Sequence, residues 1–529
     1  MVLALFYGVC VHIVYMKTKA SGSKKRSRSK SSTKVEPLLS ADRFRLYPTP
    51  EQEQVFLQIS GSCRFVYNKA LEYVRAAAAL RQAAFERDGV QSEGGVFADV
   101  YEAKKLLRAW KAEYVFLKSV PSATLQCAVL DVKDAYERFF DGQTAWPTFR
   151  KFTRDPSFEF PQFGQCKVTA PQGHKGRFRF LALPKIGMSG TLGPVKMKQH
   201  RPFSGKVRSV TVKREGGLWF ASFRVERPLE TQKPDVVGEL AARVVNEVPD
   251  FEDKSFDEQT CILDTMIASL RITGGDVGVR TPVMTSGGMP MGASVVTSAR
   301  LKKLADLQRA VDRKKEALRK ANGIAPGGSL KGVPLGNALK RAQVRLLRFY
   351  GKLARIRKDQ SHKISRALVD GCDIVALEAI ETKKMTSKVT PIEGSTRSRR
   401  RKILDVSWSQ IGAFVEYKAH WAGKRLVRVD PAYTSQTCFE CGYIDKDNRK
   451  NKGIVFKCLS CGHMDNADIN AAKNIKERSK DVLRDMLRAQ LDRRLETSSL
   501  RLGDPGESSD MTDADKKAAK PPSCLLLRK

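Results

Sequence analysis

The sequence predicts a multidomain α/β protein with a zinc ribbon near its C-terminus. Short alternating strands flank a helical block in the first half of the chain. Long basic helices and a buried strand follow in the second half, and two Cys-x-x-Cys pairs come after them. With 529 residues and 41% hydrophobic residues, the chain is long enough for two or three domains with cores of their own.

The composition points to a polyanionic partner. Lys and Arg number 95 against 57 Asp and Glu, which gives a formal net charge of +38. A surplus this large is typical of nucleic-acid-binding proteins, and a merely basic soluble protein is the alternative. Apart from the two pairs, the cysteines are scattered singly, so we expect a reducing compartment rather than a disulfide framework.

The N-terminal stretch "MVLALFYGVCVHIVYM" carries no Lys, Arg, Asp or Glu. It is short for a membrane span and lacks the basic n-region of a signal peptide. We therefore expect translation to begin at Met16 rather than Met1, with a weak membrane anchor as the alternative, and no stable membrane association. Residues 1–40 are predicted to be a basic flexible tail. The run Lys24–Lys30 predicts a nuclear location if the protein is eukaryotic, and otherwise the nucleoid or cytoplasm.

Periodicity defines the N-terminal half. A strand is predicted at Arg43–Tyr47, a helix from near Pro50, and a hairpin around Gly216-Gly217. Further helices are expected over 99–117 and 123–139, with alternating strands after Gly142. Together these elements predict a β-barrel of residues 41–50 and 141–229 that carries a helical insertion, residues 51–140.

The C-terminal half begins after an acidic stretch, residues 230–271, that fits no clear template. Two basic helices with one apolar seam are predicted over 298–320 and 337–370. A buried strand follows at Ile374–Leu377, then a helix near 409–423 and a strand in "RLVRVD". After the zinc segment, residues 479–529 are predicted to be a helix and a disordered tail.

Four cysteines predict a structural zinc ion. Cys438-x-x-Cys441 and Cys458-x-x-Cys461 have the spacing of a zinc ribbon, residues 437–465. Four thiolates leave no open coordination position, so this centre is structural rather than catalytic.

Three carboxylates could form a second metal site. Asp276 follows a predicted strand, Glu378 ends the apolar run of "DIVALE", and Asp468 opens a helix, where a plain helix cap is the alternative role. Carboxylates converging from such positions can hold Mg²⁺ or Mn²⁺, and two such ions can activate water and stabilise the leaving oxygen of a phosphodiester.

Several segments, in order, resemble the TnpB family of transposon-associated RNA-guided nucleases and its eukaryotic and viral relatives, Fanzor. They are "RLYPTPEQEQVFLQISGSCRFVYNKALEY", "SVTVKREGGLWFASFRVE", "RIRKDQSHKISRALVDGCDIVALEAI" and "VEYKAHWAGKRLVRVDPAYTSQTCFECG…FKCLSCGHMDNADINAAKNI". The similarity spans roughly residues 42–229 and 272–478.

The resemblance implies an RNA-guided, metal-dependent DNA endonuclease of a transposable element, with guide RNA and target double-stranded DNA as partners. A transposase encoded by the same element is a further possible partner. It implies an RNase H-like (RuvC-type) nuclease domain at 272–436 and 466–478, with the acidic triad at Asp276, Glu378 and Asp468. The barrel would be wedge-like and its helical insertion a recognition module.

One segment departs from the family pattern. "DVVG" (Asp235–Gly238) and "GDVGV" (Gly275–Val279) look like two halves of one strand separated by residues 239–274. We expect that segment to be either a real acidic loop or a piece foreign to the working protein. Glu381 is the weaker alternative to Glu378.

Five residues are candidates for nucleic-acid contact, with ordinary packing or solvation as the alternative: Arg64, Tyr67, Asn68, Arg150 and Arg449. Two other functions stay open. One is an RNA-guided DNA-binding regulator without nuclease activity, and the other is a zinc-ribbon RNA-binding ribonucleoprotein factor.

Overall fold

The computed structural model describes residues 38–89, 95–152, 155–170, 176–184, 186, 192–227, 234–293, 295, 297–386, 397–450 and 454–502. The predicted basic tail, including Met16 and Lys24–Lys30, lies outside the described residues except for its last three positions. The predicted C-terminal tail is outside them beyond residue 502. No described helix is both long enough and apolar enough to cross a membrane.

The N-terminal half forms a seven-stranded antiparallel sheet with the strand order β2-β6-β7-β1-β5-β4-β3. The strands are β1 Leu38–Tyr47, β2 Ser157–Phe160, β3 Lys167–Thr169, β4 Phe178–Ala182, β5 Val195–Lys198, β6 Lys206–Glu215 and β7 Leu218–Arg227. The predicted hairpin is confirmed as β6 and β7, joined at Gly216 and Gly217, which both have positive φ. Because β2 and β3 lie at opposite ends of this strand order and do not pair among the described residues, closure into a barrel stays a prediction.

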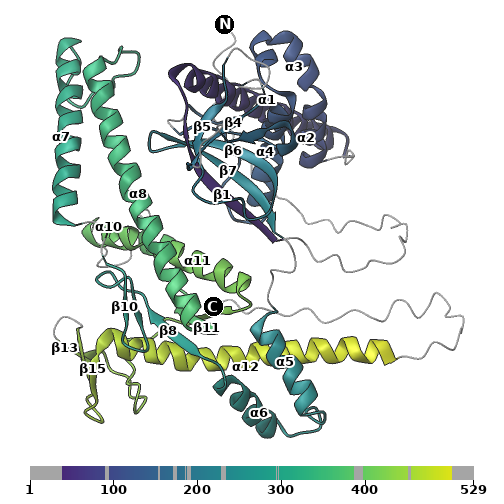
Figure 1. Ribbon diagram of the computed structural model, residues 1–529, viewed down its shortest axis with the longest axis vertical. Helices are drawn as coiled ribbons and strands as arrows, with labels where there is room; N and C mark the ends of the chain where they lie inside the picture. The colour runs from purple at the N-terminus through teal and green to yellow at the C-terminus, as the bar shows by residue number, and fades with distance from the viewer. Residues whose placement is uncertain are drawn as a thin grey trace, which may run out of the picture. The chain divides into compact units, whose positions relative to one another are not determined.

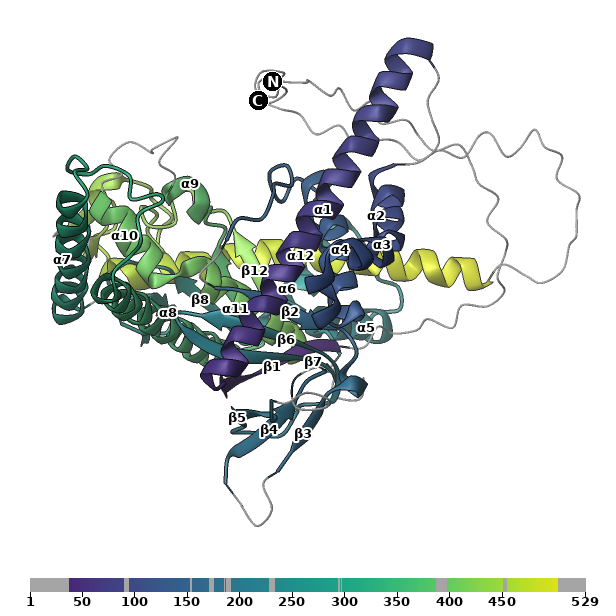
Figure 2. The same cartoon turned by 90° about the horizontal axis from the view of Figure 1, so that it is seen from above.

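Four helices lie between β1 and β2 in the chain, and Figure 2 shows the length of the first. They are α1 Pro50–Asp88, α2 Val96–Lys105, α3 Leu107–Glu113 and α4 Ser122–Phe140, with a 3-10 turn at Val115–Ser119. The helix start near Pro50 is confirmed, because Thr49 and Gln52 form a capping box. The helical stretch predicted over 99–117 is confirmed, divided into α2, α3 and the 3-10 turn, and Leu107 of α3 and Leu117 of the turn are both buried.

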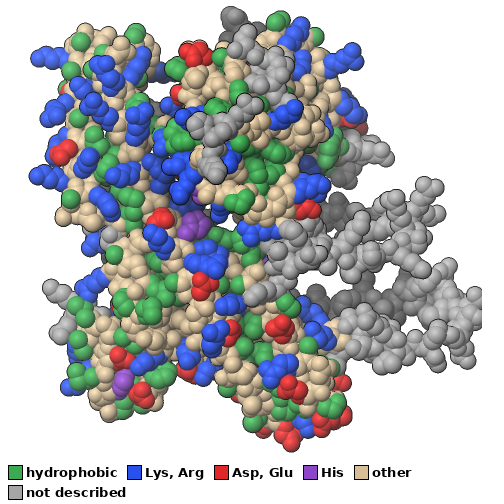
Figure 3. All heavy atoms as spheres, viewed as in Figure 1, with side chains coloured by type: hydrophobic (Ala, Val, Ile, Leu, Met, Phe, Trp, Pro, Cys, Tyr) green, Lys and Arg blue, Asp and Glu red, His purple; other side chains and the backbone are tan. Residues whose placement is uncertain are grey.

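The predicted basic helical pair is present as α7 (Ser298–Ala321) and α8 (Asn337–Gly371). Val311 of α7 packs with Leu339 and Ala342 of α8, and Leu346 borders this small core. Figure 3 shows Lys and Arg side chains along the outside of both helices. The apolar seam is therefore narrow, and Lys and Arg side chains project from the outside of the pair.

The second sheet has five strands in the order β10-β9-β8-β11-β12. They are β8 Ile272–Asp276, β9 Val283–Thr285, β10 Pro290–Met291, β11 Ile374–Glu378 and β12 Arg425–Val429. β11 is parallel to both β8 and β12, whereas β9 is antiparallel to its neighbours. The first three strands thus form a meander, to which two parallel strands are added.

Helices cover both faces of this sheet. They are α10 Arg397–Val406, α11 Trp408–Trp421 and α12 Ala467–Leu502, with the short α9 Thr382–Thr386 after β11. Side chains of β11 alternate between two cores. Val375 and Leu377 pack with α8 and α11, whereas Ile374 and Ala376 pack with α12. β11 is consequently buried on both faces, as its continuous apolar run predicts.

The acidic segment before β8 forms two helices, α5 (Val236–Glu247) and α6 (Phe256–Ala268). The expectation that Asp235–Gly238 is half of a strand is wrong. These residues begin α5, and β8 is complete without them. The reason is apolar spacing: Val237, Leu240, Ala241 and Val244 recur at helical intervals and are all buried.

Both new helices pack on α12, as Figure 1 shows. α5 shares a core with Leu483, Leu487 and Leu491 of α12. From α6, Asp264 pairs with Arg484 of α12, whose Nη2 lies 2.7 Å from Asp264 Oδ1. The acidic segment is therefore an ordered part of the layer that supports the sheet.

Candidate active site and metal centre

Asp276 and Glu378 lie at the same edge of the second sheet. Each is the last residue of its strand, β8 and β11, which run parallel with Leu377 opposite Gly275. Because parallel strands end together, the two carboxyl groups project from neighbouring positions. Glu378 is 8% exposed.

Helix α12 brings Asp468 to this edge by lying directly on β8. A Cβ atom at Gly274 would be 2.1 Å from the carbonyl oxygen of Ala472 and 2.8 Å from the amide nitrogen of Lys476. Only glycine therefore permits this contact between strand and helix. Asp468 is one helical turn before Ala472, in the first turn of α12.

The helix cap is a different residue. Asn466 Oδ1 accepts hydrogen bonds from the amide nitrogens of Asp468 (2.9 Å) and Ile469 (3.4 Å). Since Asn466 fulfils this role, the alternative role of Asp468 as a plain cap is not needed. The Asp468 side chain instead faces Arg449 of the ribbon, with Oδ1 and Nη2 3.6 Å apart.

The three carboxylates interact electrostatically. The pKa of Asp276 is raised to about 7 by burial, by the negative charge of Glu378 and by that of Asp468, while Arg449 opposes the shift. Burial also raises the pKa of Glu378, against a hydrogen bond from Thr434 and the charges of Arg478 and Arg449. The charges of Glu378 and Asp468 disfavour the ionised form of Asp276, and a divalent cation held at this place would relieve that repulsion.

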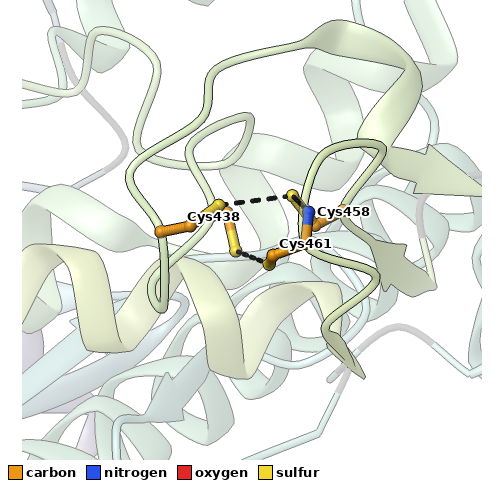
Figure 4. Close-up of side chains that lie close together, drawn as sticks. Cys438, Cys458 and Cys461 are labelled. Atoms are coloured by element: carbon orange, nitrogen blue, oxygen red, sulfur yellow. Dashed lines mark hydrogen bonds between the residues drawn. The ribbon is translucent and has the colours of Figure 1, made fainter.

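The four cysteine Sγ atoms lie within 4.8 Å of one another, so the predicted cluster is present (Figure 4). Cys438 Sγ is 3.7 Å from Cys461 Sγ, and Cys441 Sγ is 3.5 Å from Cys458 Sγ. A tetrahedral zinc ion with Zn–S bonds of about 2.3 Å has S–S edges of about 3.8 Å. The cluster therefore fits zinc in both donor chemistry and size.

Two matching turns build the cluster. Gly442 and Gly462 follow their cysteine pairs with φ of 73° and 74°. Their amides donate to the carbonyls of Cys438 and Cys458. Three short strands, β13 Arg449–Lys450, β14 Val455–Lys457 and β15 Met464–Asn466, complete the ribbon and lead into α12. Arg449 of the ribbon therefore lies beside the carboxylate of Asp468. The last strand of the ribbon leads directly into the first turn of α12, which contains Asp468.

Replacing Cys438 or Cys458 by serine is expected to remove zinc and lower the soluble yield. A structural zinc ion contributes about 10–16 kcal/mol to the folding of small zinc domains, and both sulfur atoms belong to buried residues. Metal analysis of the purified protein tests this, with Cys261→Ser, an exposed cysteine outside the cluster, as the control. Wild-type protein without zinc would contradict the assignment.

Glu381 lies apart from the carboxylates. It is beyond the end of β11, its side chain is 65% exposed, and it pairs with Lys384 at 2.9 Å. The structure therefore favours Glu378 over Glu381 at the sheet edge.

Tyr67, Asn68 and Arg150, three of the five nucleic-acid candidates, contact one another. Asn68 exchanges two hydrogen bonds with the backbone of Arg150, and the Arg150 guanidinium lies 3.7 Å from the ring centroid of the buried Tyr67. Arg150 also pairs with Asp131 at 2.9 Å. These contacts account for Tyr67, Asn68 and Arg150 without a nucleic acid. Arg64 lines a cavity of about 690 Å³ with Arg150 and Phe152, and Arg449 belongs to the carboxylate site.

Sequence reasoning missed the residues that surround Glu378. Thr434 donates a hydrogen bond to Glu378 Oε1 at 2.5 Å. Asn470, Asn474 and Arg478 of α12 hold the loop that carries Thr434. The only signal in the sequence is that Asn470, Asn474 and Arg478 follow one another at intervals of four residues, which places them along one side of the helix.

Comparison with known families gives two matches. Residues 408–475 match the Cas12f1-like TNB domain, which here spans α11, β12, the ribbon and the start of α12. Residues 38–82 match a helix-turn-helix domain of the IS605 OrfB family. In this structure those residues form β1 and most of α1 rather than two short helices.

Several relatives are similar over long stretches. InsQ of Escherichia coli (strain K12), named for RNA-guided DNA endonuclease activity, is 27% identical over 84% of this chain and 93% of its own length. Cas12f1 of Sulfoacidibacillus thermotolerans, a CRISPR-associated endodeoxyribonuclease, is 32% identical over 42% of this chain and 47% of its own. TnpB-like protein L79 of Acanthamoeba polyphaga mimivirus is 29% identical over 25% of this chain and 24% of its own.

Among solved structures, a Cas12f1–sgRNA–target DNA complex aligns with a TM-score of 0.45 and 15% identity, over 81% of this chain and 83% of that one. The family matches and the relatives point to one class of protein, the RNA-guided nucleases with a TNB domain. The chain is thus similar to the TnpB (IS605 OrfB) family of RNA-guided nucleases, which is related to Cas12f.

Proposed function

We propose that this protein is an RNA-guided, divalent-metal-dependent DNA endonuclease that cuts DNA matched to its guide next to a short flanking motif. The observation that carries the proposal is the placement of Asp276 and Glu378 at the ends of the parallel strands β8 and β11, with Asp468 in the first turn of α12; burial, together with the charges of Glu378 and Asp468, raises the pKa of Asp276 to about 7. The names of InsQ and Cas12f1 support the same activity.

The proposed nuclease domain is RNase H-like, of the RuvC type. Its support is the five-stranded sheet, in which a three-stranded meander is followed by two parallel strands. The ribbon and the first turns of α12 would complete this domain. We further propose that the seven-stranded sheet and helices α1 to α4 bind guide RNA and the flanking DNA motif, which fits the delegation of sequence readout to base pairing in guided nucleases.

The carboxylates of Asp276, Glu378 and Asp468 would hold two Mg²⁺ or Mn²⁺ ions. Bound there, the metal would supply an activated water and charge stabilisation for the leaving oxygen of the phosphodiester. The chain's own contribution is to fix the three acids on rigid elements. β8 and β11 set Asp276 and Glu378 side by side, and α12 is seated on Gly274. Arg449 adds a positive charge at the same place, where a phosphate would approach.

The basic surface has a consequence for binding. Binding to DNA without a guide match is expected to weaken steeply with salt, because each neutralised phosphate releases counterions. For about six phosphate contacts, the affinity should fall about 10³-fold between about 50 and 200 mM salt. A filter-binding titration measures this slope, and an affinity nearly independent of salt would contradict a broad cationic channel.

A guide-exchange experiment tests the function. The RNA that co-purifies is sequenced, its guide segment is replaced, and plasmids matching the old or new guide are incubated with the protein and Mg²⁺. We expect cutting to follow the guide and to stop when EDTA is added. Guided binding without cutting would indicate a nuclease-inactive regulator, whereas RNA binding without target recognition would indicate a ribonucleoprotein factor. Either result overturns the proposal.

A further inference from the structure

The side chain of Glu378 accepts a hydrogen bond from Thr434. The Thr434 hydroxyl donates to Glu378 Oε1 at 2.5 Å, and the two residues are 1% and 8% exposed. The hydroxyl also lies 3.1 Å from the carbonyl oxygen of Pro431. Its single proton can serve only one acceptor, and the nearer carboxylate is the stronger one. One of the two oxygens of Glu378 is therefore engaged by the protein itself.

Thr434 is not free to move away from Glu378. It lies in the loop between β12 and Cys438, and three side chains of α12 bind the backbone of this loop. Asn474 Nδ2 donates to the carbonyls of Thr434 (2.9 Å) and Thr437 (2.7 Å). Arg478 donates to the carbonyl of Ala432 at 2.5 Å.

Asn470 makes further hydrogen bonds from α12, in this case to the start of the ribbon. Its Nδ2 donates to the carbonyl of Thr437 at 2.8 Å, and its Oδ1 accepts from the amide of Phe439 at 3.0 Å, next to the zinc ligand Cys438. Asn470 and Asn474 are 0% and 7% exposed. The helix that carries Asp468 thus also anchors, through buried polar contacts, the loop that carries Thr434.

We propose that Thr434 is a positioning residue for Glu378 and that the polar row Asn470, Asn474 and Arg478 sets its place. This inference rests on the proposed nuclease function. By engaging Oε1, the hydroxyl fixes the rotation of the carboxyl group and would leave the other oxygen available to hold a metal ion. Asp468, Glu378 and the first zinc knuckle are then held in one hydrogen-bonded unit built on α12.

The chemistry of the contact favours a positioning role over packing alone. A packing role would be filled equally well by valine, which has nearly the shape of threonine and no hydroxyl to place against a buried carboxylate. Hydrogen-bonded partners of metal-binding side chains typically contribute about 10–100-fold to metal affinity or activity. An effect of that size is measurable and depends on the hydroxyl.

The test compares Thr434→Val with Thr434→Ser in Mg²⁺-dependent cleavage of a guide-matched plasmid. We expect Thr434→Val to cut about 10–100-fold more slowly and to need more Mg²⁺ for half-maximal rate. Thr434→Ser should stay close to wild type. Zinc content, thermal unfolding and target binding in a gel shift should be unchanged in both variants, which separates positioning from loss of structure.

The outcomes separate the positioning role of Thr434 from the proposed nuclease function. If Thr434→Val fails to fold, Thr434→Ser and Thr434→Ala, which differ from each other only by the hydroxyl, carry the same comparison. Cleavage by Thr434→Val at the wild-type rate and Mg²⁺ dependence overturns the positioning role while the proposed function stands. A wild-type protein that binds guide and target but never cuts overturns the proposed function, and this inference with it.

Discussion

Replacing Asp276 or Glu378 by alanine is expected to lower guided DNA cleavage by about a thousandfold or more, while binding of guide RNA and target stays nearly intact. The reason is that each carboxylate would hold a metal ion that supplies several kcal/mol of transition-state stabilisation. Binding energy comes instead from base pairing and from the cationic surface. Plasmid cleavage in Mg²⁺ beside a gel shift with the same guide measures the two effects separately.

Two controls sharpen this expectation. Because a metal centre acts as a unit, the double variant Asp276→Ala, Glu378→Ala should cut little worse than either single one. Glu381→Ala should cut almost normally, since Glu381 is exposed and paired with Lys384. Strong loss in Glu381→Ala together with activity in Glu378→Ala would exchange the roles of the two glutamates.

Deleting residues 239–274 is expected to leave the protein insoluble. The deletion removes most of α5, all of α6 and the first three residues of β8, and so uncovers the core that α12 shares with the sheet. Each fully buried Val or Leu contributes about 1.5–3 kcal/mol relative to exposure, against a total stability of about 5–15 kcal/mol. Soluble expression and thermal unfolding of the deleted chain measure the loss.

A matched pair of substitutions in α5 gives the control. Leu240 is 3% exposed and Val245 is 38% exposed on the same helix. Leu240→Ala should cost about 2–5 kcal/mol, whereas Val245→Ala should stay within about 1 kcal/mol of wild type. A deleted chain that remains soluble and cuts would show that α5 and α6 are dispensable additions.

Much of the fold could be predicted from local sequence patterns. The zinc cluster follows from cysteine spacing alone, and the burial of β11 from its unbroken apolar run. The helix α5 is different, because its apolar residues do have helical spacing. Asp235–Gly238 also resembles a strand motif of the family, which predicts a strand instead of a helix. In the structure these residues follow the helical spacing and begin α5.

The surroundings of Glu378 could not be predicted in this way. Thr434 is 56 residues after Glu378, and their hydrogen bond exists only because β11, β12 and α12 fold together. Asn470 and Asn474 look like ordinary helix residues until the loop that they bind is placed. Contacts of this kind depend on the tertiary arrangement, and no periodicity encodes them. The close packing of α12 on Gly274 is a third case, since a single glycine in a strand gives no indication of which element lies on it.

The central claim is that Asp468 holds metal at the proposed active site, and Asp468→Ala tests it most directly. Asn466 already caps α12, so the variant should fold, retain zinc and bind guide and target as wild type does. The measurement is the rate of Mg²⁺-dependent cleavage of a guide-matched plasmid by the two proteins under conditions of equal target binding. We expect no cutting above background by Asp468→Ala. Cleavage at the wild-type rate would contradict it, because Asp468 would then be only a residue of the first helical turn.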